Sequence, residues 1–225
     1  MKATIFIIST VVIFYLMSLL HKKYSYPYLL PILTSTIILI PLLLILDIPY
    51  AEYMEGGQYI QHLLGPAVVS LAYPLYNQRH LIGKYKYTIL SGILIAMISG
   101  LISVFLISLL FKLEDSYILT ALPKSLTTPV AMQVSETING IPPLTAVLVM
   151  IAGFVGALLG PFMYKLGKIT SPISRGISMG SASHGVGISK LKDYGEEDLS
   201  IGSLSMGLSA VVGAVICPVF VWIFF

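Results

Sequence analysis

The sequence predicts an all-α polytopic membrane protein with about six full transmembrane helices and two discontinuous or re-entrant segments. Composition is the first observation behind this prediction: 56% of the 225 residues are hydrophobic and only 10% are charged. The mean hydropathy is +0.91. Soluble domains have about 25% charged residues and cannot hide this much apolar surface. The second observation is that no long polar stretch interrupts the chain, so we expect residues 1–225 to form a single integral membrane domain.

Six apolar runs qualify as full spans because each approaches the roughly 20 residues that a transmembrane helix needs. The first run follows Lys2 and has no small-residue cleavage pattern after it, so we expect a retained span rather than a signal peptide. Cys217 lies inside the last run, where it is expected to serve as a small core hydrophobe, and a single cysteine excludes an intramolecular disulfide. The six runs are 3–20, 28–46, 58–76, 87–111, 144–164 and 200–224.

Two further apolar segments, 117–136 and 174–190, are crowded with Ser, Thr, Gly and Pro and carry an ionisable residue near the middle. Backbone that leaves the helix at membrane depth is tolerated only where it is buried in protein or lines a cavity. We therefore expect both segments to be broken or re-entrant. If both cross fully instead, the chain has eight crossings.

Loop charge supports the topology with six crossings. Cytoplasmic loops of membrane proteins carry an excess of Lys and Arg. If the basic loops lie inside, segment 117–140 enters and leaves from the outside, and segment 174–195 does the same from the inside. That opposition is expected of an inverted repeat, with halves at about 28–111 and 117–225. The basic loops are 21–26, 77–86 and 165–175, whereas 47–57 has only acidic charges.

The first broken segment reads LTALPKSLTTPVAMQVSE, residues 119–136. Pro123 is expected to end the helix before it, and Thr128 followed by Pro129 is typical of an N-cap and a first helical position. The new helix then directs its free N–H groups and positive dipole end into the break, where an anion is favoured. The alternative is that the lysine only reaches for the interface. The predicted anion-binding groups are Lys124, Ser125, Thr127 and Thr128.

The second broken segment, SRGISMGSASHGVGISKL, places His184 among small residues. A histidine in such a break either makes a structural hydrogen bond or contacts substrate and carries a proton, because imidazole titrates near neutral pH. The predicted substrate-binding residues here are Ser181, Ser183, His184 and Gly185. In the earlier segment 55–76, Pro66 is expected to kink the helix.

The sequence gives no specific signal for an enzyme. It contains no HExxH, P-loop or CxxC pattern, and its four histidines are scattered, so neither catalysis nor a metal or other cofactor is expected. The net charge of +3 is small and lies in loops, so it does not suggest nucleic acid.

Three stretches resemble the LrgB/CidB family of bacterial membrane proteins. They are GGQYIQHLLGPAVVSLAYPLY, LPKSLTTPVAMQVSETINGIPPLTA, and GSASHGVGISKL with the Gly/Ser-rich last helix. The resemblance runs from about Pro49 to the C-terminus. It implies either antiholin-like regulation of murein hydrolase export and lysis, with a smaller LrgA/CidA partner, or transport of small monocarboxylates. Among the relatives that are regarded as transporters, bacterial members move pyruvate and a plastid member exchanges glycolate and glycerate.

The residues favour transport, because a helix N-terminus, a lysine and hydroxyls near mid-membrane suit a two- or three-carbon acid. We expect a proton-coupled or exchanging carrier in the bacterial cell membrane, with His184 and Glu136 as coupling candidates. The alternative is a holin- or antiholin-like pore-forming or regulatory protein. Helix faces rich in small residues suggest helix packing and a homodimer. The sequence leaves open whether an LrgA/CidA-like chain is needed.

Overall fold

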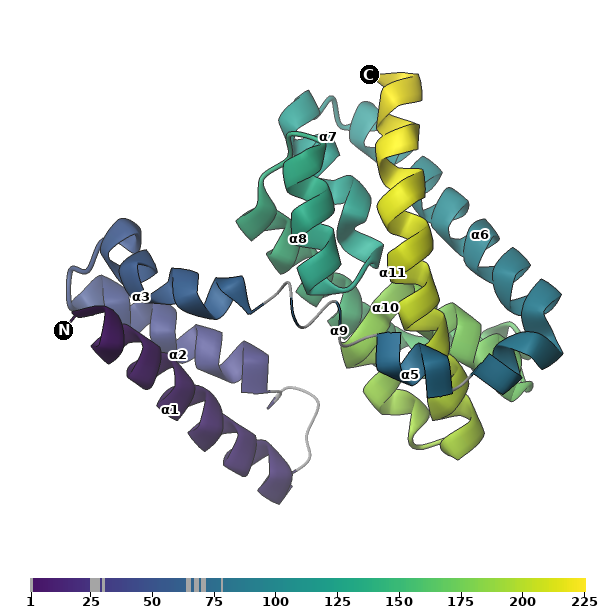
Figure 1. Cartoon of the computed structure of the whole chain (residues 1–225), viewed down its shortest axis with the longest axis horizontal. Coiled ribbons are helices and arrows are strands. Elements are labelled where there is room, and N and C mark those ends of the chain that lie inside the picture. Colours follow the sequence, from purple (N-terminus) through teal and green to yellow (C-terminus); the bar gives the residue numbers. More distant parts are fainter. Residues whose placement is uncertain are drawn as a thin grey trace. The chain divides into compact units, whose positions relative to one another are not determined.

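The computed structural model describes residues 2–24, 29, 31–63, 66, 69, 72–77 and 79–225. Within these residues the regular structure is entirely helical, as predicted. The chain forms two compact units, residues 1–67 and 68–225, which are described separately (Figure 1). This boundary is a different one from that between the expected repeat halves, which stay a prediction.

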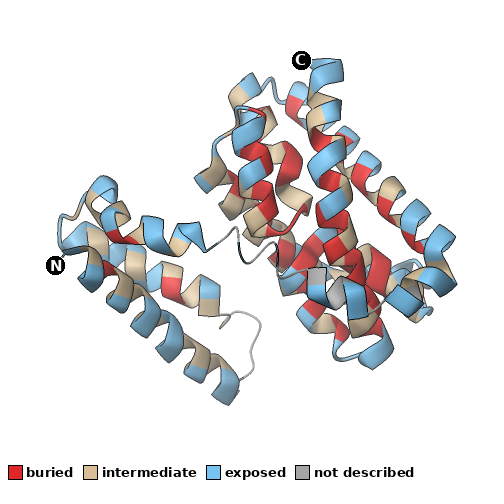
Figure 2. Cartoon of the chain, in the orientation of Figure 1, coloured by how far each residue is buried: buried red, intermediate tan, exposed pale blue. Residues whose placement is uncertain are grey.

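The first unit contains α1 (Lys2–Tyr24), α2 (Pro31–Ile45) and α3 (Tyr50–His62), with α1 packed against both of the others. Gly56 lets α3 approach α1 closely, because an added Cβ would lie 2.5 Å from the carbonyl oxygen of Ala3. Tyr53 packs edge-on against Phe6, with ring centroids 5.8 Å apart, and its hydroxyl is 2.9 Å from Thr10 Oγ1. Few side chains of this unit are buried (Figure 2).

The second unit contains a short helix, four long helices and a broken hairpin. Helix α5 (Ala72–Asn77) precedes α6 (Arg79–Leu110), which leaves helical geometry at Tyr85. The hairpin consists of α7 (Asp115–Ala121), the 3₁₀ turn η2 (Leu122–Ser125) and α8 (Thr128–Thr137). The unit ends with α9 (Pro142–Leu166), α10 (Pro172–Leu191) and α11 (Glu196–Phe224).

In the part of the chain that the structure describes, four helices are long and apolar enough to cross a membrane: Lys2–Tyr24, Ile82–Leu110, Pro142–Leu166 and Glu196–Phe224. Helix α2 is apolar but has only 15 residues, which at 1.5 Å per residue is about 22 Å and short of a roughly 30 Å bilayer core. The predicted span 58–76 falls partly outside the described residues. The chain is therefore a multi-pass membrane protein. The count of six crossings and the inverted repeat stay predictions.

Four helices end in the same left-handed turn without glycine at the turning position. Asp47, Lys112, Asn139 and Lys168 all have φ between 51° and 61°. The next residue in each case donates its N–H to the carbonyl five positions earlier, at 2.7 to 3.0 Å, which is the hydrogen bond of a Schellman motif. These turns end α2, α6, α8 and α9 abruptly and let the chain reverse.

The core of the second unit follows one face of α6 and the matching face of α11 (Figure 2). Ile89, Ile93, Met97 and Leu101 recur every fourth residue and are buried on the side of α6 that packs against η2, α10 and α11. Cys217 lies in this core with 1% exposure, as expected of a small hydrophobe. The long helices thus form the frame that holds the broken hairpin.

A buried polar cluster fixes the broken hairpin to α9. Thr145 Oγ1 donates to the carbonyl of Thr120 at 2.8 Å and lies 2.7 Å from Ser135 Oγ, and all three residues are fully buried. The amide of Ile141 donates to Thr120 Oγ1 at 2.9 Å. At Gly140 an added Cβ would lie 2.5 Å from Ser135 Oγ. These bonds join α7, α8 and α9 next to the break in the hairpin.

Candidate functional site

The first broken segment leaves the α-helix within the stretch expected from the sequence. Helix α7 ends at Ala121, and a 3₁₀ turn starting at Leu122 carries Pro123 at its first positions. Leu126 and Thr127 are extended before α8 begins. The N-cap is Thr127, so the choice of Thr128 was wrong by one residue, and Pro129 occupies the second helical position rather than the first. Proline is compatible with both positions because the first turn lacks N–H partners.

The second broken segment is one helix with a single break at His184, where φ is 32° and ψ is −138°. Residues other than glycine rarely adopt this backbone conformation, which costs roughly 1–3 kcal/mol. His184 is buried at 4% exposure. The neighbouring glycines explain how this break fits: an added Cβ at Gly156 would collide with the side chain of Ser183, and one at Gly187 would collide with Ser183 Cβ. The broken part of α10 therefore packs closely against α9.

The two breaks contact each other. His184 Nε2 lies 3.3 Å from the carbonyl oxygen of Lys124, at a separation of 60 residues in the chain. A carbonyl can only accept, so in this contact Nε2 carries the hydrogen. The irregular backbone of η2 leaves that carbonyl available, because the helical hydrogen-bond ladder is interrupted there.

Lys124 lines a groove of about 440 Å³ between α9 and α10. It is half-buried, and within the described part of the chain it forms no ion pair. An ionisable group inside a membrane segment is costly unless it has a partner or faces a cavity. The other lining residues are Ala152, Val155, Gly156, Leu159, Gly160, Met163, Tyr164, Ser178, Met179, Ala182 and Ser183.

The predicted residues of the second break are divided between the groove and the helix interface. Ser183 shares the groove with Lys124. Ser181 faces α11, where it accepts a hydrogen bond from Ser209 Oγ at 3.0 Å. Gly185 is exposed, with open space around its Cα.

The predicted residues of the first break also point in different directions. Ser125 lines a small cavity on the α6 and α11 side, together with Gly100, Gly213 and Cys217. Thr127 is 8% exposed, and its Oγ1 is buried without a hydrogen-bond partner among the described residues. Such a group costs about 1–3 kcal/mol when it stays unpaired.

Two predicted residues lie at opposite ends of α8. Thr128 begins α8 and is partly exposed, whereas Glu136 is exposed near the other end of that helix. Eight residues at 1.5 Å each separate the two by about 12 Å along the axis. Pro66 is helical and exposed, but most of its neighbours lie outside the described residues, so the expected kink there stays a prediction.

The small residues of α9 pack against α10, as their spacing predicted. Added Cβ atoms would meet Val186 at Gly153 (2.9 Å) and Met179 at Gly160 (2.5 Å). Gly213 of α11 likewise receives Leu126 from the first break. Because these faces are filled within the chain, they no longer support the homodimer, which stays a prediction.

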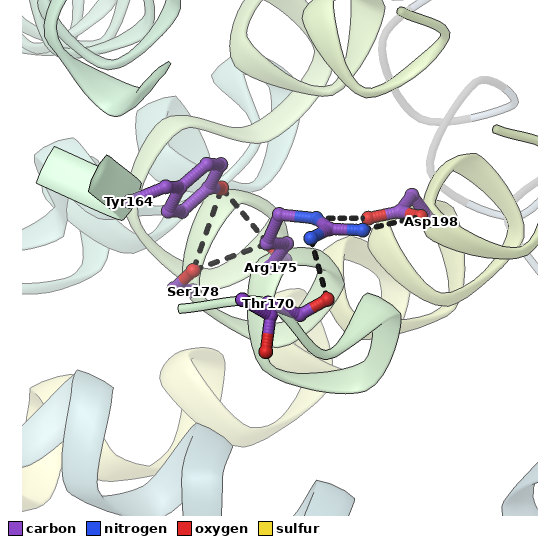
Figure 3. Close-up of polar contacts among 5 residues, drawn as sticks. All are labelled: Tyr164, Thr170, Arg175, Ser178 and Asp198. Atoms are coloured by element: carbon purple, nitrogen blue, oxygen red, sulfur yellow. Dashed lines mark hydrogen bonds and ion pairs between the residues drawn. The ribbon is translucent and has the colours of Figure 1, made fainter. Parts of the chain in front are cut away.

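A buried ion pair that sequence reasoning missed lies beside the groove. Arg175 Nε is 2.6 Å from Asp198 Oδ1, and its NH2 group is 3.2 Å from Oδ2 (Figure 3). The two side chains are only 13% and 3% exposed. The remaining guanidinium nitrogen donates to the carbonyl of Thr170 at 2.6 Å. A bidentate pair of this kind fixes the start of α10 to the start of α11.

The same cluster borders the end of the groove. The hydroxyl of Tyr164 donates to the carbonyl of Arg175 at 3.0 Å, and Ser178 Oγ is 3.1 Å from that carbonyl (Figure 3). Tyr164 and Ser178 both line the groove. The guanidinium also lies 4.8 Å from the ring centroid of Tyr194. The groove therefore runs from a lysine at the breaks to hydroxyls that are already bonded to the main chain.

This arrangement is suited to holding a small anion. Lys124, which has no ion pair among the described residues, and Ser183 line one space, and the N-terminus of a ten-residue helix lies three residues after the lysine. No group of three potential metal ligands occurs among the described residues.

Comparison with known proteins gives a consistent picture over the full length. The sequence model of the LrgB-like family matches residues 10–223. The protein YxaC of Bacillus subtilis is 45% identical over 222 residues, which is 99% of this chain and 96% of that protein. Proteins named Holin-like protein CidB are 33% identical in Staphylococcus epidermidis and 34% identical in Staphylococcus aureus, each over all of this chain and 98% of the relative. No solved structure matches the chain.

Proposed function

This chain belongs to the LrgB-like family, and on that premise we propose that it carries small monocarboxylates across the bacterial cell membrane. The substrates are two- or three-carbon acids such as pyruvate and glycolate. The observation that carries the proposal is the position of Lys124: it is half-buried, lacks an ion pair among the described residues and lines a groove where two helix breaks meet.

The proposed site has a physical reason at each part. The ammonium of Lys124 attracts the carboxylate, and it has no carboxylate partner among the described residues to compete. Thr127 has a buried hydroxyl to offer at the N-terminus of α8, and Ser183 has one in the groove. Hydrogen bonds to a charged partner contribute about 1.5–3 kcal/mol each. Discontinuous helices facing a substrate recur in carriers for the same reason.

Coupling is assigned to His184. Its Nε2 donates a hydrogen bond to the Lys124 carbonyl. Binding of a proton at the other ring nitrogen, or of an anion at the lysine, would therefore alter the junction of the two breaks. Proton movement through this imidazole would link anion binding to the pH gradient. Glu136 is the second coupling candidate, although it lies at the far end of α8.

A second candidate function is favoured by the relatives. The relatives from the two Staphylococcus species are named Holin-like protein CidB. This name suggests a pore-forming or regulatory role in the membrane, linked to murein hydrolase control. This role requires no saturable binding of an acid.

Reconstitution of the purified protein in liposomes separates the two functions. The liposomes contain a fluorescent dye, and uptake of labelled pyruvate and glycolate is measured with and without a pH gradient. A carrier gives saturable uptake while the dye is retained. Release of the dye together with unsaturable entry of every solute would contradict the carrier and support the holin-like role.

A partner is tested in the same system. If this chain alone is inactive, co-reconstitution with an LrgA/CidA-like membrane protein is the next arm. Saturable uptake only with both chains would make this protein one half of a two-chain carrier. Inactivity in both arms would contradict the proposed function.

A further inference from the structure

The groove beside Lys124 is much larger than a three-carbon acid. Its volume is about 440 Å³. A three-carbon keto acid has about six non-hydrogen atoms, and at roughly 30 Å³ each, the share of one water molecule in the liquid, it fills less than half of this space. A substrate held at Lys124 therefore leaves most of the groove free.

The walls of the groove are apolar beyond the lysine. Helix α9 contributes Ala152, Val155 and Leu159, and α10 contributes Met179 and Ala182. Each methylene group that moves from water into such surroundings strengthens binding about fourfold. The walls thus favour a hydrocarbon tail over water or a second polar group.

Charge in the groove limits the substrate to one negative group. Lys124 is the sole charged residue among those that line it. A dicarboxylate would place its second carboxylate on apolar walls without a cation, and burying an unpaired charge is strongly unfavourable.

The far end of the groove offers no free hydroxyl donor. Tyr164 donates its hydroxyl hydrogen to the carbonyl of Arg175, and Ser178 Oγ is bonded to the same carbonyl. The end that faces the substrate tail therefore has no hydroxyl hydrogen left to donate to a carboxylate or carbonyl on that tail.

We propose that the groove takes monocarboxylates with a short apolar tail, such as 3-methyl-2-oxobutanoate, a branched 2-oxo acid, with the carboxylate at Lys124 and the tail between α9 and α10. This inference rests on the proposed carrier function and extends its substrates beyond three carbons. The occupant is a soluble acid rather than a lipid chain, because a fatty acid of about 18 non-hydrogen atoms would need roughly 540 Å³ on the same scale, which is more than the groove offers.

The first test compares acids on the reconstituted wild-type protein. Labelled pyruvate and labelled 3-methyl-2-oxobutanoate are offered separately, and unlabelled branched acid and oxaloacetate are used as competitors. We expect the branched acid to be taken up, and to inhibit pyruvate uptake at a concentration about tenfold below that required of pyruvate itself. Oxaloacetate should not compete.

The outcomes separate this inference from the proposed function. Uptake of pyruvate without uptake or competition by the branched acid overturns the inference and leaves the carrier intact. Uptake of neither acid, with or without the partner chain, overturns both. Strong competition by oxaloacetate overturns the restriction to a single negative charge.

The second test narrows the groove. Ala152→Phe places a ring among the lining residues, and Ala182→Phe does so from the opposite wall. Ala214→Phe adds the same bulk at an exposed position of α11 outside the groove and serves as the control. Each groove variant should weaken the branched acid relative to pyruvate by at least tenfold, whereas the control should leave the ratio as in wild type. If a groove variant elutes as folded protein in detergent and its preference for the branched acid over pyruvate is unchanged, the inference is overturned. That result is expected if a lipid chain or a second copy of the protein fills the groove instead.

Discussion

At the scale of single residues, the break in the hairpin is defined by groups that lack their usual partners. The Oγ1 of Thr127 is buried and unbonded among the described residues, and Lys124 has no ion pair there. Buried polar groups normally find a partner, so each exception requires an explanation. In the proposed carrier, the carboxylate of the substrate would pair with Lys124, and a hydrogen bond from Thr127 to it is a separate prediction.

Thr127→Val tests the hydroxyl without changing the shape of the side chain. We expect stability to be unchanged or slightly higher, because the variant removes an unpaired buried hydroxyl. The KM for pyruvate should rise at least about tenfold, because a hydrogen bond to a charged group contributes about 1.5–3 kcal/mol. Thermal unfolding in detergent and liposome uptake measure the two effects. An unchanged KM would remove Thr127 from the site.

His184→Gly tests the coupling residue while sparing the backbone. Glycine adopts the φ of 32° without strain, so the break should remain intact. We expect exchange of labelled for unlabelled pyruvate to continue while the response to a pH gradient is lost. Retention of the full pH response would show that the proton passes elsewhere, with Glu136→Gln as the next variant.

Local chemistry explains which residues of the site were predictable. Prolines and hydroxyl residues act on their own neighbours, so the break near Pro123 and the helix start near Thr127 follow from the sequence within one residue. The direction of each side chain depends on packing across the chain. The sequence therefore could not separate Ser125, which faces α6 and α11, from Ser183, which shares the groove with Lys124.

At the scale of elements, α10 is fixed at its start and interrupted near its middle. The Arg175–Asp198 pair fixes its start to α11, and His184 breaks it at the contact with η2. Asp198 follows Glu196 and Glu197, which are both exposed, so charge alone does not distinguish it. Its helical spacing to Ile201, Gly202 and Ser205 does place it on the packing face of α11, a signal that the sequence analysis did not use.

Asp198→Asn should destabilise the second unit. The variant leaves the partly exposed guanidinium of Arg175 without its carboxylate. Breaking a fully buried pair costs about 3–5 kcal/mol, and because solvent reaches Arg175 we expect a loss of about 1–3 kcal/mol. Glu197→Gln, a similar change at an exposed neighbour, should have little effect. Thermal unfolding of the purified proteins in detergent compares them. Equal melting temperatures for the two variants would show that the ion pair does not hold α10.

At the scale of the whole molecule, composition predicted the class and the fold more reliably than the number of crossings. Apolar runs identified the four long helices because a span of this length has a strong local signal. Helix α2 is shorter than its apolar run because Pro31 opens it and a left-handed turn at Asp47 follows its end. Only the arrangement of the full chain in the bilayer decides how such a segment is counted.

Membrane topology is testable with single cysteines. In a Cys217→Ala background, a cysteine replacing Glu114 should react with an impermeant thiol reagent from outside the cell, and one replacing Lys84 only after the cytoplasmic face is exposed. The reason is that basic loops stay inside and α6 separates the two positions. Labelling of both positions from the same side would contradict the predicted topology.

The central claim, that Lys124 holds the carboxylate of the substrate, is tested most directly by uptake of labelled pyruvate into liposomes containing Lys124→Gln. Lys112→Gln, an equal loss of charge at an exposed turn, is the control, and Lys124→Arg tests rescue by charge. We predict that saturable uptake is lost in Lys124→Gln, partly restored by Arg and unchanged in the control. Wild-type kinetics in a well-folded Lys124→Gln protein would contradict the claim.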